Sequence, residues 1–188
     1  PNVGRPKMFL DVQNNKIGAS KKFFGLPKGH VVVVSSGSSA LYLALWSLNG
    51  KDKRVGVPVY SCSSLRNATG LIGAKTIFLD CDDQSPNLSI EQAMQRDIEI
   101  LIAPSMFGIP IELPFNRKFK VIEDIAQSLG AKVDGKPIGL RGDIGICSFY
   151  ATKMITSGGQ GGAVISRDKT LNFSGDKKAT KIIFEPQK

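Results

Sequence analysis

Short runs of β-branched and other apolar residues recur along the middle of the chain, and helical patterns separate several of them. The runs are near-continuous, as in strands that are buried on both faces of a parallel sheet. They lie at Val31–Val34, Arg54–Val57, Lys75–Leu79, Ile98–Ala103, Phe119–Ile122, Ile144–Phe149 and Gly162–Ser166. The helical patterns lie at Ser39–Leu48, Ser64–Ile72 and Ser89–Arg96. This alternation predicts an α/β fold, a three-layer α/β/α sandwich around a mostly parallel sheet of about seven strands.

The two ends of the chain are basic, and its body is not. The 188 residues carry a net charge of +9. Residues 1–30 hold six Lys/Arg against one Asp, residues 167–188 hold six against three acids, and residues 31–166 hold thirteen against twelve. We therefore expect a basic N-terminal arm (1–30), one domain (31–168) and a basic C-terminal tail (169–188). Solvated ends are favoured over nucleic-acid binding, for which Lys21-Lys22-Phe23-Phe24 is the remaining signal.

Several classes of protein are excluded by what the sequence does not contain. No apolar run approaches the roughly 20 residues of a membrane span, and no apolar secretory segment opens the chain. Three cysteines without a CxxC pair suit a reducing cytosol, so we expect a cytoplasmic protein with no disulfide scaffold. His30 is the sole histidine, which excludes three-His and HExxH zinc sites, and we expect no metal. Chemistry is left to lysine, carboxylates, hydroxyls and backbone amides.

A serine-rich turn, Ser35-Ser36-Gly37-Ser38-Ser39, follows the first predicted strand and opens the first predicted helix. Free N–H groups, small hydroxyls and the positive end of a helix together favour a bound phosphate. The turn matches neither the Walker A loop nor GxGxxG. An ordinary serine-rich N-cap explains the same residues equally well.

A second candidate segment is an apolar strand that ends in Glu123 and Asp124. Neighbouring strand residues point to opposite faces, so only one of the two carboxylates faces the crevice at the carboxyl ends of the strands, where ligands bind in such sheets. Gln127 returns to the same face if a helical turn follows. An aspartate that merely caps the next helix is the alternative.

A later strand delivers Ser148 and, five residues on, Lys153 beyond the strand end. The apolar neighbours of Lys153, which are Phe149, Tyr150 and Met154, are expected to favour its neutral amine. Schiff-base chemistry needs a lysine in this form. An ordinary surface lysine is the alternative. The segment Thr156–Gly162 then holds four glycines in five positions, which indicates a tight turn, a close backbone approach or a flexible hairpin.

In this order and spacing, the segments resemble the DegT/DnrJ/EryC1/StrS family of pyridoxal-phosphate (PLP) sugar aminotransferases, over residues of about 31–168. The matching stretches are SSGSSALYLAL, VGVPVYSCSSLRNA, GAKTIFLDCD, VIEDIAQSLGA and GKPIGLRGDIGICSFYATKMITSGGQGGAVIS. The last stretch is the most specific, because it combines Gly-Asp-Ile-Gly, Ser-Phe-Tyr, the lysine and the glycine loop. The resemblance implies the PLP-binding large domain of a fold-type I enzyme that forms a homodimer, with each active site at the subunit interface.

The resemblance also assigns roles to residues of this chain. It implies that Lys153 forms the Schiff base with the cofactor and later moves the proton. Asp124 would pair with the protonated pyridine nitrogen, and Gln127 would lie beside the phenolic oxygen and the ring. Ser148 and the turn Gly37-Ser38-Ser39 would hold the phosphate.

Two features depart from the family pattern. Where many members place an aromatic residue against the cofactor ring, this chain has Cys62, with Tyr60 two residues earlier. A sulfur atom packs against a ring more weakly than an aromatic side chain does. Family enzymes are also roughly twice as long, and nothing after Ser166 resembles their C-terminal small domain, so we expect that domain to be absent.

The expected activity is transfer of an amino group from an amino acid, glutamate, to a nucleotide-linked keto-sugar. Family dehydratases carry histidine in place of the lysine, so Lys153 favours transamination. The alternative is a truncated, catalytically inactive homologue that acts as a PLP-binding or regulatory module.

Overall fold

The computed structural model describes residues 30–167. The predicted arm and tail lie outside the described residues, except for His30. All the predicted strands are present within one or two residues of their expected bounds. They are β1 (His30–Val34), β2 (Arg54–Pro58), β3 (Lys75–Leu79), β6 (Ile100–Pro104), β7 (Lys120–Asp124), β10 (Ile144–Ser148) and β11 (Gly162–Ser166).

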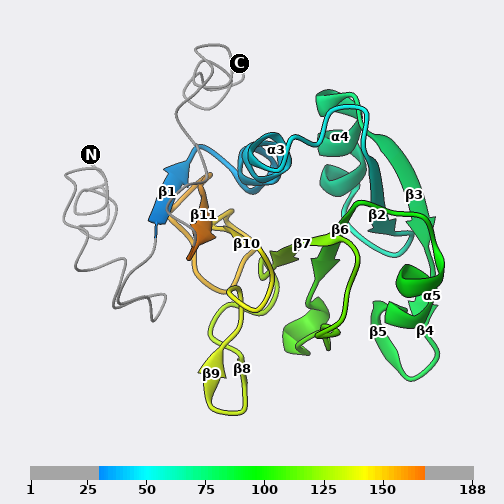
Figure 1. Ribbon diagram of the computed structural model, residues 1–188. Helices are drawn as coiled ribbons and strands as arrows, with labels where there is room; N and C mark the ends of the chain where they lie inside the picture. The colour runs from blue at the N-terminus through cyan, green and yellow to red at the C-terminus, as the bar shows by residue number, and fades with distance from the viewer. Residues whose placement is uncertain (1–29, 168–188) are drawn as a thin grey trace, which may run out of the picture.

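These strands form one 7-stranded sheet in the order β1-β11-β10-β7-β6-β2-β3 (Figure 1). Strand β11 is antiparallel to both of its neighbours, and every other neighbouring pair is parallel. The mostly parallel sheet is therefore confirmed. Because the parallel strands share one direction, the segments that follow β6, β7 and β10 emerge along the same edge.

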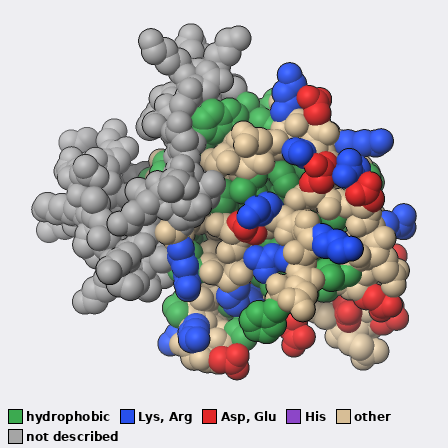
Figure 2. All heavy atoms as spheres, in the orientation of Figure 1, with side chains coloured by type: hydrophobic (Ala, Val, Ile, Leu, Met, Phe, Trp, Pro, Cys, Tyr) green, Lys and Arg blue, Asp and Glu red, His purple; other side chains and the backbone are tan. Residues whose placement is uncertain are grey.

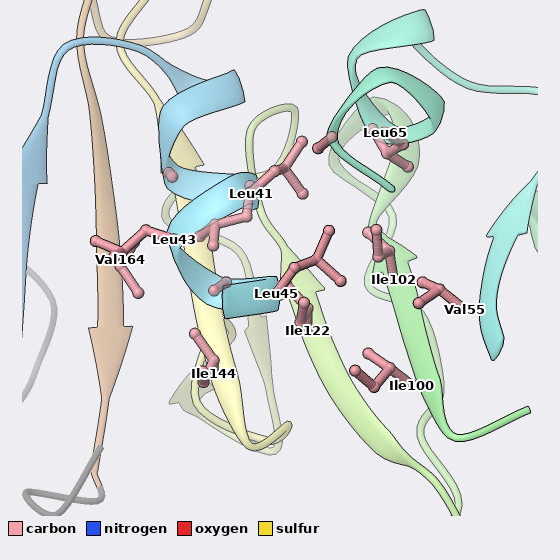
Figure 3. Packing of buried hydrophobic residues seen from close by; sticks show 14 of the residues in the cluster. Leu41, Leu43, Leu45, Val55, Leu65, Ile100, Ile102, Ile122, Ile144 and Val164 are labelled. Carbon is pink, nitrogen blue, oxygen red and sulfur yellow. The ribbon is translucent and has the colours of Figure 1, made fainter. Parts of the chain in front are cut away.

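Helices α3 (Gly37–Ser47) and α4 (Ser63–Ile72) cover one face of the sheet, as Figure 1 shows. Helix α3 begins at the predicted serine-rich turn, because the Ser36 side chain accepts a hydrogen bond from the Ser39 N–H at 3.1 Å. Its apolar side chains are buried against the strands. Figure 3 shows Leu43 beside Val164 and Leu45 beside Ile122.

The opposite face is covered by short elements. Helix α5 (Ile90–Gln95) packs there through the buried Ala93, and its predicted cap Ser89 accepts from the Gln92 N–H. The rest of this layer consists of loops and two hairpins, β4 (Cys81–Asp82) with β5 (Ser85–Leu88) and β8 (Lys132–Val133) with β9 (Lys136–Pro137). The three layers are as predicted, but the sequence analysis did not foresee either hairpin.

Charged side chains are dispersed over the described body. Figure 2 shows Lys and Arg interleaved with Asp and Glu, with acidic side chains gathering at the lower right, where Figure 1 places β4, β5 and α5. Ion pairs join Lys53 to Glu99 at 2.7 Å and Lys120 to Asp143 at 2.9 Å. No described helix has the length and apolar character of a membrane span. Among the described residues, no cluster of His, Cys, Asp and Glu is suited to hold a metal ion.

Candidate active site

A cavity of about 400 Å³ lies where β6, β7 and β10 end and where α3 and α4 begin. Its wall brings together almost all of the residues that the sequence analysis selected from separate segments. They are Gly37, Ser38, Cys62, Asp124, Gln127, Ser148 and Lys153. Ser39 is the exception, because its hydroxyl bonds to those of Ser35 at 3.0 Å and Ser36 at 2.9 Å and does not line the cavity.

The beginning of α3 forms one end of the cavity. Ser36 acts as the N-cap while Gly37 and Ser38 line the cavity, so the N-cap and the anion site are compatible functions of one turn. No acidic side chain lies in the first turn, and the N–H groups of a first helical turn have no partners within the helix. A Cβ atom at Gly37 would lie 2.8 Å from the Cβ of Ser148, so glycine is required for α3 to approach the end of β10 this closely.

The glycine-rich segment makes a second close approach to the same turn. A Cβ atom at Gly162 would collide with the carbonyl oxygen of Ser36, and Gly158 has a φ of +82°. Both of the predicted uses of glycine, a tight turn and a close backbone approach, are therefore present. Gln160, from the same segment, also lines the cavity.

Glu123 and Asp124 point away from each other, as the strand geometry predicted. Glu123 is fully buried, and its carboxylate accepts hydrogen bonds from the backbone N–H of Arg141 at 2.9 Å and from its Nη2 at 2.6 Å. Asp124 lines the cavity and accepts a hydrogen bond from the Ala126 N–H at 2.9 Å. Burial raises the pKa of the Asp124 carboxyl to about 6, against the opposing effects of this N–H and of the Lys153 charge.

Lys153 reaches the cavity from a turn that follows β10, where its N–H donates to the Tyr150 carbonyl oxygen at 2.9 Å. Its side chain is half-buried. The expected apolar surroundings are incomplete: Met154 is 68% exposed and Tyr150 48% exposed, while Phe149 is buried. Tyr150 nevertheless lines the cavity together with Lys153, so the expectation that these three neighbours desolvate the amine stays a prediction.

Cys62 is the N-cap residue of α4 and is exposed at the cavity wall. Interactions with the hydroxyl and then the N–H of Ser64 lower the pKa of its thiol, and the positive charge of Lys153 adds to this. Tyr60, two residues earlier, does not line the cavity; its ring lies 6.4 Å from that of Phe107.

Ser105 and Met106 also line the cavity, and the sequence analysis missed them. Met106 contacts the predicted residue Gln127, whose Nε2 donates to the Met106 sulfur at 3.7 Å. The signal was present in the sequence. Ser105 and Met106 come just after an apolar strand, and Asp124 is the last residue of another. Ligands bind at the carboxyl ends of parallel strands, so this rule selects Ser105 and Met106 as well as Asp124.

Similar proteins identify the family of this chain. The sequence profile of the DegT/DnrJ/EryC1/StrS aminotransferase family matches residues 19–175. The chain belongs to this family. Its aminotransferases are PLP-dependent. The family resemblance noted in the sequence is thereby confirmed.

Over 152 residues, the chain is 36% identical to the GDP-perosamine synthase of Escherichia coli O157:H7, covering 76% of this chain and 42% of that enzyme. It is 34% identical over 152 residues to the UDP-N-acetyl-3-dehydro-alpha-D-glucosamine 3-aminotransferase of Acidithiobacillus ferrooxidans, covering 76% of this chain and 41% of that one. A solved structure, that of the aminotransferase from Psychrobacter cryohalolentis, matches with a TM-score of 0.75 at 27% identity, covering 82% of this chain and 41% of that chain. The chain thus spans about two fifths of the length of these relatives.

Proposed function

We propose that this chain is the PLP-binding domain of a sugar aminotransferase that moves an amino group from glutamate to a nucleotide-linked keto-sugar. The observation that carries the proposal is the meeting of Lys153, Asp124 and the beginning of α3 in one cavity. The names of two relatives, a GDP-perosamine synthase and a UDP-linked glucosamine aminotransferase, support a nucleotide sugar as the substrate.

The beginning of α3 suits the cofactor phosphate. The positive end of the helix, the N–H groups of Gly37 and Ser38 and the hydroxyl of Ser148 lie at one end of the cavity, with no acidic side chain in the first turn. Ser39 supports this turn by bonding to Ser36 rather than by contacting a ligand. The cofactor-binding role of Ser39 is therefore proposed to be indirect.

Asp124 suits the ring nitrogen. A buried carboxylate with a raised pKa is short of a positive partner, and a protonated pyridine nitrogen supplies one. When bound, PLP supplies an electron sink for the carbon that carries the amino group. Asp124 would then hold a proton on the ring nitrogen, and Gln127 and Cys62 would hold the ring from the cavity wall that they line.

Lys153 is proposed to hold the cofactor covalently and to move the proton during amino transfer. Lys153 is half-buried and lines the cavity, so its amine can reach a cofactor bound there. The three cysteines are free thiols, which suits the reducing cytoplasm that we propose as the location of the protein.

The test is to add PLP, reduce with borohydride and map the modified lysine by mass spectrometry. We expect an adduct on Lys153 in the wild type and none in Lys153→Ala. Lys136→Ala, on hairpin β8–β9 and outside the cavity, is the matched control and should retain the adduct. Labelling spread evenly over surface lysines would contradict the proposal. Glutamate-dependent formation of pyridoxamine phosphate is measured separately, in protein that has not been reduced. An adduct on Lys153 in the reduced sample, with no pyridoxamine phosphate formed in the unreduced one, would instead support the inactive PLP-binding module.

A further inference from the structure

The turn that follows β6 is held in an unusual backbone conformation. Its only regular element is the 3-10 turn η1 (Met106–Gly108), in which Phe107 has a φ of +53° and Gly108 a φ of +83°. A phenylalanine rarely adopts such a left-handed conformation without support from neighbouring groups. The residues just before and within this turn, Ser105 and Met106, line the cavity.

The support comes from Asn87, on strand β5 of the hairpin β4–β5. Its Oδ1 accepts a hydrogen bond from the Met106 N–H at 2.8 Å, and its Nδ2 donates to the Ile109 carbonyl oxygen at 3.1 Å. One buried side chain, 4% exposed, therefore joins the two ends of the turn. Asn87 itself does not line the cavity.

The Met106–Gly108 turn also holds Gln127. The Phe107 N–H donates to the Gln127 Oε1 at 3.4 Å, and the Gln127 Nε2 donates to the Met106 sulfur at 3.7 Å. The carboxamide of Gln127 is thus oriented by a turn whose ends are joined by Asn87. The connection runs from the β4–β5 hairpin to the cavity through residues that lie far apart in the chain.

We propose that Asn87 is a positioning residue for the cofactor site, acting through the Met106–Gly108 turn on Gln127. The effect on PLP rests on the proposed function, whereas the effect on the turn does not. The Asn87 side chain must both accept and donate a hydrogen bond, because the turn presents an N–H at one end and a carbonyl oxygen at the other. Leucine provides neither a donor nor an acceptor, and an ionised aspartate provides only an acceptor. A protonated aspartic acid provides both.

The test compares amide hydrogen exchange by NMR in the cofactor-free wild type, Asn87→Leu and Asn87→Asp. In Asn87→Leu, we expect the amides of Met106, Ile109 and Ile111 to exchange roughly 10 to 100-fold faster, the loss expected for an unpaired buried polar group. In Asn87→Asp, protection factors should approach wild-type values at low pH, where the carboxyl is protonated, and fall as pH rises. Ile109 and Ile111 make no hydrogen bond to Asn87 through their N–H groups, so they report the turn rather than the deleted bond.

The matched control is Thr69→Val, which removes a fully buried hydroxyl that bonds to Thr76 at 2.8 Å, away from the turn. Thr69→Val should lower the free energy of unfolding of the whole protein. It should leave the protection of the Met106, Ile109 and Ile111 amides unchanged relative to that of other amides. If Thr69→Val loosens the turn as much as Asn87→Leu, or if Asn87→Leu affects only the Met106 amide, the positioning role is wrong.

A second measurement extends the test to the cofactor. Asn87→Leu should weaken PLP binding roughly tenfold in a spectral titration while leaving the borohydride adduct on Lys153, because the lysine itself is not displaced. If the wild type fails to bind PLP, the proposed function fails, and the exchange data still decide whether Asn87 holds the Met106–Gly108 turn. If the wild type binds PLP and Asn87→Leu binds it equally well, the positioning role fails and the proposed function stands.

Discussion

Glu123 and Asp124 are adjacent carboxylates whose environments separate their roles. The guanidinium and backbone N–H of Arg141 satisfy Glu123 inside the protein, and replacing one partner of such a buried pair costs about 3–5 kcal/mol. Asp124 has a single N–H partner and the more distant charge of Lys153. Asp124 is therefore the carboxylate that destabilises the folded, cofactor-free protein and is available to a ligand.

Replacing Asp124 by asparagine should stabilise the cofactor-free protein at neutral pH. The pKa of Asp124 is raised to about 6 in the folded protein from 3.8, so the folded state binds this proton more tightly than the unfolded state does. The stabilisation that this bound proton gives the folded state is complete below about pH 4 and is lost as pH rises through 6. The gain from Asp124→Asn should grow over this interval to about 3 kcal/mol in the free energy of unfolding.

The measurement is urea unfolding of both proteins between pH 4 and 7.5, where asparagine keeps the acceptor for the Ala126 N–H. A difference in unfolding free energy that does not change with pH would show that the Asp124 pKa is not raised. The same variant should lose affinity for PLP, so stability and cofactor binding should change in opposite directions.

At the scale of elements, the strands were predictable because each is a near-continuous apolar run buried on both faces. The hairpins were not, since β4, β5, β8 and β9 are short and partly exposed, so no apolar period marks them. One signal was nevertheless present: Asp134 and Gly135 have φ of +50° and +73°, and an Asp-Gly pair is typical of a two-residue hairpin turn. The role of Asn87 depends on a hairpin and a turn meeting across the fold, which no local pattern reports.

The two glycines of α3 and α4 allow a prediction in which one substitution has opposite effects. A Cβ atom at Gly37 would lie 2.8 Å from the Ser148 Cβ, whereas a Cβ atom at Gly70 meets nothing within 4 Å. Gly70→Ala should therefore raise the free energy of unfolding by about 0.5–1 kcal/mol through helix propensity. Gly37→Ala should lower it by about 1–3 kcal/mol, because α3 must move away from β10.

Thermal and urea unfolding, with and without inorganic phosphate, would measure both changes. Gly37→Ala should also lose most of the stabilisation that phosphate gives, while Gly70→Ala should keep it. Equal stabilisation of the two variants by phosphate would contradict the assignment of the anion site to the beginning of α3.

At the scale of the whole molecule, the two edges of the sheet differ in character. Exposed apolar side chains border the segments around the cavity, among them Tyr60, Phe107, Ile109, Tyr150 and Met154. The opposite edge has a more polar hollow of about 580 Å³, lined by Lys53, Arg117, Lys118 and Asp143 among others. The ring centroids of Tyr60 and Phe107 lie 6.4 Å apart, and large apolar side chains exposed together are typical of an interface. We propose that the chain forms the homodimer that the family resemblance implies, with the subunits meeting at the active sites.

This proposal predicts that single charges on the cavity side weaken self-association. Ile109→Lys and Met154→Lys should each raise the Kd of the dimer at least roughly tenfold in sedimentation equilibrium, because a lysine must be desolvated in the interface. Phe115→Lys is the matched control, since Phe115 is fully exposed and lines the hollow at the opposite edge. A wild type that stays monomeric at high concentration would refute the dimer. If instead Phe115→Lys disrupts the dimer and the other two do not, the subunits meet at the opposite edge, and each cavity is formed by one subunit alone.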